Sequence, residues 1–334
     1  MFQFNAVGKN CFVKPHSHQH QHCNNPQSQF PILDYGKETS SLMMMATQPP
    51  HGTVPDRDYG LSGKVNALWS GDFKTRNFNV SPLMFSNKMF IGGIPPNMSK
   101  DAILSLLQKF DMNLSVQWPE LNMNSKTTPP YLRIVMSSNE NVSKLLENCE
   151  FVVEGGCETF NYEIFYKSKR RHLQIVPWLS TDSNFKRSHV VMSQLPTKFT
   201  VFVGALHGRM HAVAIANIFD DVFGDVTSVR IDTDQHDYPT GSGRVTFGNA
   251  SSFKKAVLSN FIQIDSKKVK KRIQIEPCID GQSCCLCLEE NVPNFCKKLE
   301  CFDYYCNPCW LIRHHPANGE VLDHSPIRRK SKTL

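Results

Sequence analysis

The stretches KMFIGGIPP (Lys88 to Pro96) and TVFVGALHG (Thr200 to Gly208) repeat one pattern: an apolar residue, phenylalanine, an apolar residue, glycine, a small residue and an apolar residue. Alternation of this kind predicts a strand with one buried face. Each stretch precedes a segment with the apolar spacing of a helix, SKDAILSLLQKF (Ser99 to Phe110) and HAVAIANIFDDVF (His211 to Phe223). The sequence therefore predicts the same strand-and-helix unit twice.

The segments that follow the two units also correspond in order. Second strands are predicted at 114–118 and 226–232, third strands at 131–136 and 242–247, second helices at 139–149 and 249–258, and closing strands at 172–176 and 272–276. Each copy then has the order β-α-β-β-α-β. This is the ferredoxin-like plan of an α+β protein.

A chain of 334 residues is long enough for two or three separate cores. We predict, in chain order, a disordered N-terminal region, a first ferredoxin-like domain, a linker, a second such domain, a cysteine-rich module and a basic tail, at residues 1–84, 85–178, 179–198, 199–277, 278–327 and 328–334. Residues 1–84 lack a sustained period, and we assign no function to their tract HSHQHQH (His16 to His22). No stretch approaches the ~18 to 20 apolar residues of a membrane span, so we expect a soluble, intracellular protein without a membrane partner.

Alternation also predicts which side chains point away from the helices of each domain. The residues of the first and third strands on this open face are Phe90, Tyr131 and Arg133 in the first domain and Phe202, Ser242 and Arg244 in the second. Exposed rings on adjacent strands resemble the RNA-recognition motif, in which they stack unpaired bases. The first domain departs from the longer signature at Pro129 and Pro130, and the second lacks its outer aromatic residues. An open face that binds protein instead is the alternative, because a fold does not determine a function.

Charge is compatible with a polyanionic partner. The net charge is +7, and the basic clusters KSKRR (Lys167 to Arg171) and KKVKKR (Lys267 to Arg272) flank the closing strands. Arginine can both stack on a base and reach a phosphate. Basic clusters are nevertheless more often solvated faces, so they support RNA binding only together with the rings.

The C-terminal part contains paired cysteines with metal-ligand spacing. Eight of the 12 cysteines lie between Cys278 and Cys309. In a reducing compartment such clusters indicate zinc rather than disulfides. The candidate ligands, spaced C-x2-C-x8-C-x4-C-x4-C-x2-C-x4-H-x9-H, are Cys284, Cys287, Cys296, Cys301, Cys306, Cys309, His314 and His324.

Eight ligands make two tetrahedral sites, and the order of the pairs predicts a cross-brace. The two C-x2-C pairs, 284/287 and 306/309, take one Zn²⁺, while the remaining two cysteines and two histidines take the other. Tyr304, Tyr305 and Trp310 form the small core, and Cys278 and Cys285 are spare thiols. His315 is the alternative to His314, and His324 is the least constrained ligand by spacing.

A cross-braced module could also belong to a RING-type ubiquitin ligase. RING order places a histidine between cysteines, whereas both histidines come last in this chain. Four-ligand sites leave no open position for a hydrolytic water, and no nucleophile, phosphate loop or carboxylate pair stands out. We therefore predict no enzymatic activity and no small-molecule substrate.

Several stretches together carry a more specific resemblance: VFVGALHGRM (Val201 to Met210), IDTDQHDYPTGSGRVTF (Ile231 to Phe247), QIVPWLSTDSNF (Gln174 to Phe185) and the Cys/His series. They resemble the cytoplasmic polyadenylation element-binding protein family over residues 88–327. The resemblance implies two degenerate RNA-recognition motifs, a Pro-Trp linker and a ZZ-type zinc module.

The resemblance also implies a function. Members bind U-rich elements of the UUUUAU type in mRNA 3′ untranslated regions and control poly(A) tail length and translation, often in germ cells and early development. It implies polyadenylation, deadenylation or translation-repression factors as partners. It further implies a cytoplasmic location, with ribonucleoprotein granules or passage through the nucleus left open. Carried over by position, its RNA contacts add Trp118 and the linker residue Trp178 to the open-face residues.

Overall fold

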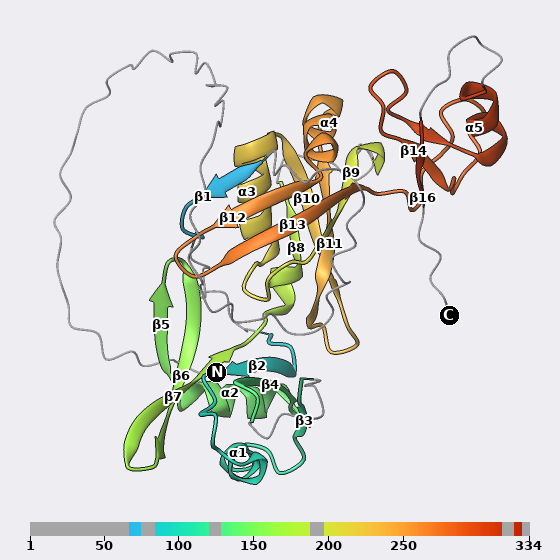
Figure 1. Ribbon diagram of the computed structural model, residues 1–334. Coiled ribbons are helices and arrows are strands. Elements are labelled where there is room, and N and C mark those ends of the chain that lie inside the picture. Colours follow the sequence, from blue (N-terminus) through green and yellow to red (C-terminus); the bar gives the residue numbers. More distant parts are fainter. Residues whose placement is uncertain (1–66, 75–83, 120–127, 188–196, 316–323, 329–334) are drawn as a thin grey trace, which may run out of the picture. The chain divides into compact units, whose positions relative to one another are not determined.

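The computed structural model describes residues 67–74, 84–119, 128–187, 197–315 and 324–328 (Figure 1). They contain two α+β domains and a small C-terminal module, as the sequence predicts. Residues 1–66 of the predicted N-terminal region lie outside the described residues, and the histidine tract is among them. Among the helices described, none has the length and apolar character that crossing a membrane requires.

The first domain has a six-stranded sheet in the order β3-β4-β2-β7-β6-β5. Its strands are β2 (Lys88–Gly92), β3 (Ser115–Gln117), β4 (Tyr131–Val135), β5 (Glu150–Glu154), β6 (Cys157–Tyr166) and β7 (Lys169–Val176). Its helices are α1 (Lys100–Leu107) and α2 (Asn139–Glu147). Ser99 is the N-cap of α1, because its hydroxyl accepts a hydrogen bond from the backbone N–H of Ala102 at 3.2 Å.

The second domain has a seven-stranded sheet in the order β1-β12-β13-β9-β11-β10-β8. The strands are β1 (Leu68–Ser70), β8 (Asn184–Lys186), β9 (Thr200–Gly204), β10 (Val226–Thr233), β11 (Pro239–Phe247), β12 (Phe261–Asp265) and β13 (Lys270–Pro277). The helices are α3 (Ala212–Phe223) and α4 (Ala250–Ser259), with short 3-10 turns η1 (Ser180–Ser183) and η3 (Thr197–Phe199).

The predicted parity of both central strands is confirmed. Met89 and Ile91 are completely buried beneath the helices, and so are Val201 and Val203 in the second copy. The third strands bury Leu132, Ile134, Val245 and Phe247 in the same way. The open faces therefore carry the residues that alternate with these.

Two sequence expectations need correction. Residues 68–70 were expected to be disordered, but β1 pairs in parallel with β12 and satisfies its backbone at an existing sheet edge. Residues 184–186 were expected to be linker, but β8 pairs with β10 at the opposite edge. Three-residue strands carry too little alternation to be detected, because their stability comes from the sheet they join.

The C-terminal module contains β14 (Asn294–Cys296), β15 (Tyr304–Tyr305), β16 (Pro326–Arg328) and α5 (Asn307–Arg313). Tyr304 and Tyr305 are buried as predicted, whereas Trp310 is half-buried and contacts the Tyr305 ring edge-on at 5.9 Å. Phe295, which is completely buried against Tyr304, completes this small core.

Candidate nucleic-acid interface and metal centres

Two rings lie together on the open face of the first domain. The ring centroids of Phe90 on β2 and Tyr131 on β4 are 5.4 Å apart, and the ring planes are inclined by 24°. The two rings are therefore stacked. Both residues are half-buried, which leaves part of each ring accessible. Burial raises the pKa of the Tyr131 phenol although Arg133 opposes this, so the ring stays neutral at pH 7. The pair is an uncharged aromatic platform.

A glycine two positions after each phenylalanine makes room for its ring. A Cβ atom at Gly92 would lie 3.0 Å from the Phe90 ring, and one at Gly204 would lie 3.4 Å from the Phe202 ring. Residues two apart on a strand share a face, so a side chain at either position would meet the ring. The repeated Phe-x-Gly pattern thus has a steric cause in both domains.

Arg133 is the charged residue among those predicted for the open face of the first domain. It pairs across the sheet with Phe90 on one side and Gln117 on the other, which places it on the open face as predicted. The structure therefore brings Phe90, Tyr131 and Arg133 onto one surface. The two rings are accessible to a partner, whereas the Arg133 side chain also hydrogen-bonds with the Tyr238 side chain.

The open face of the second domain is built around an ion pair. Phe202 on β9 lies opposite Arg244 on β11. The Arg244 guanidinium donates to the Asp232 carboxylate at 2.6 Å and lies 3.5 Å from that of Asp280. Ser242 donates to the second oxygen of Asp232 at 2.8 Å. The three predicted residues share a surface, but both polar ones are already held by a carboxylate.

This carboxylate changes the electrostatics of the second face. Although burial lowers the pKa of Arg244, Asp232 raises it above its usual value, so the guanidinium stays charged. Asp232 lies on β10, a different strand from Arg244, so its role depends on a strand register that the sequence of β11 does not contain. Arg244 must exchange its carboxylate partner for any phosphate that it binds.

Two predicted contacts do not lie on the open faces. Trp118 follows β3 with the parity of Val116 and packs against the core beside the helices, where the Lys100 ammonium lies 5.0 Å from its ring. Trp178 is only 3% exposed, and its indole N–H donates to Ser183 at 3.0 Å. Neither ring joins the Phe90–Tyr131 pair, and the RNA contact predicted for each residue stays a prediction. Their positions in the sequence did not reveal which surface covers them.

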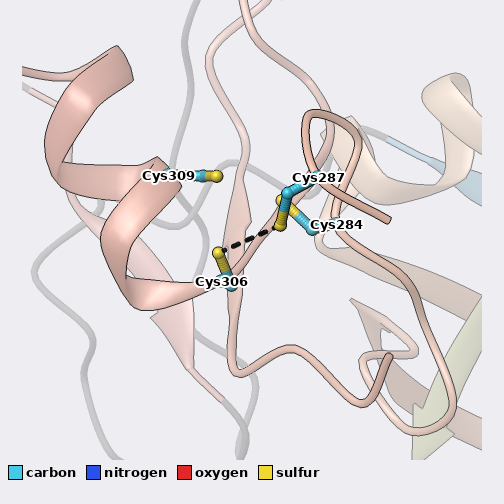
Figure 2. A group of neighbouring side chains, drawn as sticks. All are labelled: Cys284, Cys287, Cys306 and Cys309. Atoms are coloured by element: carbon cyan, nitrogen blue, oxygen red, sulfur yellow. Dashed lines mark hydrogen bonds between the residues drawn. The ribbon is translucent and has the colours of Figure 1, made fainter. Parts of the chain in front are cut away.

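Four thiols converge at the first candidate metal centre (Figure 2). Cys284 and Cys287 come from a tight turn closed by the Leu288 N–H donating to the Cys284 carbonyl at 3.0 Å. Cys306 caps the N-terminus of α5, and Cys309 lies in the first turn of that helix. All four sulfur atoms lie within 4.8 Å of one another, and those of Cys287 and Cys306 are 3.6 Å apart.

The second centre combines two thiols and two imidazoles. The Cys301 sulfur lies 3.5 Å from His314 Nε2 and 3.6 Å from His324 Nδ1, which is also 3.6 Å from the Cys296 sulfur. His314 Nδ1 lies 2.9 Å from the Trp310 carbonyl, so that nitrogen can donate its proton there and leave Nε2 free for a metal. His315 is not in the group, so the geometry favours His314.

The separations fit tetrahedral zinc. With Zn–S near 2.3 Å and Zn–N near 2.1 Å, tetrahedral coordination places two sulfurs ~3.8 Å apart and a sulfur and a nitrogen ~3.6 Å apart. The measured separations of 3.6 Å and 3.5 to 3.6 Å agree with these values. Helix α5 supplies Cys306 and Cys309 to one centre and is capped by His314 of the other, so one short helix links both centres.

The surroundings of Cys284 favour its charged form. Burial alone raises the pKa of this thiol, but backbone N–H groups of Cys287, Cys306 and Leu286 outweigh that effect and lower its pKa. A thiolate is the form that binds a metal. Cys278 and Cys285, the thiols predicted to be spare, lie outside both groups.

Comparison with known proteins agrees with this architecture. Profiles described as RNA recognition motif match residues 86–177 and 201–270, and the profile described as the cytoplasmic polyadenylation element-binding protein ZZ domain matches residues 271–330. The last match begins within β13, although that strand pairs with β9 in the second sheet.

The chain is also similar to curated proteins. It is 33% identical over 300 residues to cytoplasmic polyadenylation element-binding protein 3 of Caenorhabditis remanei, covering 82% of this chain and 38% of the relative. It is 35% identical over 275 residues to cytoplasmic polyadenylation element-binding protein 1 of Carassius auratus, covering 79% of this chain and 48% of the relative. The chain thus spans half or less of the length of these relatives.

One of the similar solved structures is that of the RNA binding domain of Hrp1 in complex with RNA. It shares 17% identity and a TM-score of 0.22, covering 58% of this chain and 96% of that one, a likeness too low to carry an argument.

Two RNA recognition motifs followed by a ZZ-type module define a modular protein of the RRM class. The combination of these domains and the identity to curated relatives are more specific than either domain alone. The chain belongs to the cytoplasmic polyadenylation element-binding protein family.

Proposed function

We propose that this protein binds single-stranded mRNA through the open faces of its two RNA-recognition motifs. The observation that carries the proposal is the stacked pair of Phe90 and Tyr131, whose neutral, half-buried rings lie on a face that no helix of the domain covers. Unpaired bases stack on such rings, whereas bases within a duplex are already stacked on one another. Arg133 beside the rings adds a charge for the phosphate backbone.

The preferred sequence is a U-rich element of the UUUUAU type in 3′ untranslated regions. This part of the proposal rests on membership of the family and not on geometry, since base stacking alone tolerates many sequences. On the same ground we propose that binding regulates poly(A) tail length and translation. Polyadenylation, deadenylation or translation-repression factors are the proposed protein partners, and the proposed location is the cytoplasm.

The C-terminal module is proposed to hold two structural Zn²⁺ ions. The ligands are Cys284, Cys287, Cys306 and Cys309 at one centre and Cys296, Cys301, His314 and His324 at the other. Four protein ligands saturate a tetrahedral ion, so neither centre would activate a water, and we propose no enzymatic activity. Much of the folding free energy of so small a module would come from the metal.

Binding to defined oligonucleotides tests the proposal. The full chain should bind UUUUAU at least about tenfold more tightly than a shuffled single strand of equal composition, a difference of about 1.4 kcal/mol. It should bind a duplex of the same sequence more weakly still. Equal affinity for the shuffled strand would reject the sequence preference. Absence of binding to every single strand would reject the RNA function in favour of a protein-binding open face.

A further inference from the structure

Strands β6 and β7 of the first domain extend past the strands of its centre (Figure 1). Strand β7 pairs with β2 only from Gln174 to Val176, whereas its residues 169–175 pair with β6. The outer parts of the two strands therefore form a hairpin that overhangs the end of β2. The apolar spacing predicts a closing strand at 172–176, whereas β7 is longer and β6 was not predicted.

Strand register shows which side of the hairpin continues the open face. Val176 lies opposite Phe90, and Gln174 lies opposite Gly92, so alternate residues of β7 share the face of the aromatic platform. The next two on this side are His172 and Arg170. Their partners on β6 are Glu163 and Phe165, which lie on the same side of the hairpin.

An exposed ring and an arginine lie together at the outer end of this row. Phe165 is 69% exposed, and the guanidinium carbon of Arg170 lies 5.9 Å from the centroid of its ring. Glu163 approaches both Arg170 and His172 at 3.8 Å, which orients these side chains across the strand pair. The two side chains therefore present one accessible ring and one cation on this face of the hairpin.

The turn that joins the strands has an uncommon backbone. Its central residues, Lys167 and Ser168, both have positive φ angles, of 50° and 60°. This geometry suits a two-residue hairpin turn but usually selects glycine or asparagine, because a side chain is disfavoured there. Lys167 therefore places a positive charge at the tip of the hairpin in a disfavoured backbone conformation. Backbone strain of this kind is concentrated at functional sites.

We propose that the Phe165–Arg170 pair is a further binding site for the same RNA strand, which contacts nucleotides beyond the bases stacked on Phe90 and Tyr131. Single-stranded RNA is the occupant because the row is continuous with the aromatic platform and ends in the cation Arg170, next to Lys167 in the turn. The seven residues from Val176 to Arg170 span ~20 Å, so the Phe165–Arg170 pair lies that far from the residue opposite Phe90. This inference rests on the proposed RNA-binding function.

The test compares RNA lengths with the full chain. Affinity is measured for UUUUAU and for strands of about ten nucleotides that carry uridines on its 5′ or its 3′ side, within the usual range of single-strand site sizes. One of the two extended strands, 5′ or 3′, should bind at least about fivefold more tightly than UUUUAU. This factor is the lower end of the gain in affinity that one stacked base contributes. Phe165→Ala combined with Arg170→Ala should reduce this gain to about one.

Arg171→Ala is the matched control, because it removes the same charge from the neighbouring position on the opposite face of the strand. It should keep at least about half of the gain in affinity, since only non-directional attraction is lost. A gain that survives the double substitution, or that Arg171→Ala removes equally, would overturn the proposal. So would equal affinity of the wild type for short and extended strands. Absence of binding to every single strand, short or extended, would instead reject the underlying RNA function.

Discussion

Removing the Phe90 ring tests the aromatic platform most directly. Phe90→Ala deletes one ring of a pair whose centroids are 5.4 Å apart. One stacked base contributes about 1 to 3 kcal/mol, which corresponds to about 5- to 150-fold in Kd. We therefore expect Phe90→Ala and Tyr131→Ala each to weaken binding to UUUUAU by about tenfold or more.

The salt dependence of binding separates stacking from charge. Both rings are neutral, so the bases that stack on them release no counterions when the RNA binds. Removing a ring should therefore leave the slope of log K against log salt unchanged. Fluorescence anisotropy with a labelled UUUUAU strand, at several salt concentrations, measures affinity and slope together. The core residues on either side, Met89 and Ile91, are untouched, so thermal unfolding should show that the domain still folds.

Two further variants sharpen this prediction. Phe90→Leu keeps an apolar side chain but removes the π face, so it should lose most of the affinity that alanine loses. The double variant with Tyr131→Ala should lose less than the product of the two single effects, because rings in contact act as one platform. Undiminished binding by both alanine variants would show that RNA does not lie on this face, and the reasoning from strand parity to function would fail.

Three other substitutions test the remaining parts of the interface and the module. Cys306→Ser should release about one of two zinc ions in a metal assay, since a centre that loses one thiolate loses affinity, whereas Cys285→Ser should retain both; equal loss would refute the ligand assignment. Arg244→Ala should lower the salt slope of RNA binding by about one, while Asp232→Asn, which removes the nearer of the two carboxylates beside the guanidinium, should tighten binding at low salt; an unchanged slope for Arg244→Ala would exclude a phosphate contact. Gly92→Ala should weaken RNA binding by ~1 kcal/mol or less, because its Cβ would push the Phe90 ring aside without removing it, and full affinity would show that the ring's tilt is irrelevant.

The elements of both domains could be predicted because their periods are long enough to be read. Helices α1 and α3 and strands β2, β4, β9 and β11 all lie where apolar spacing predicts them. The short strands β1 and β8 could not be found in this way, since three residues hold no measurable period. Their stability comes from backbone pairing with β12 and β10, which are distant in sequence.

The ligand groups show a different kind of predictability. A C-x2-C pair places two sulfurs on one tight turn, so local spacing suggested which residues share a centre. The choice between His314 and His315 needed the structure, because it depends on how α5 ends. There the Trp310 carbonyl orients the His314 ring, and Trp310 stacks on it at 3.9 Å.

Strand parity predicted the open faces but not their charge balance. Trp118 and Trp178 were assigned by resemblance, and packing removed both from the faces. The partners of Arg244 could not be found from its own strand, because Asp232 lies on β10 and Asp280 follows β13. Cross-strand neighbours depend on register, which the sequence of one strand does not contain.

The two faces should therefore contribute to binding in different ways. The first presents neutral rings whose contribution depends little on salt. In the second, Arg244 already has a carboxylate partner, so binding a phosphate replaces one ion pair with another and yields less free energy than an unpaired cation would. The Asp232 carboxylate repels any phosphate that approaches Arg244. An RNA strand that does not displace this carboxylate therefore binds with a less favourable free energy. The ion pair thus favours correct placement of the strand over tight binding. Affinity then comes mainly from the first face, and the second chiefly discriminates between ways of placing the strand.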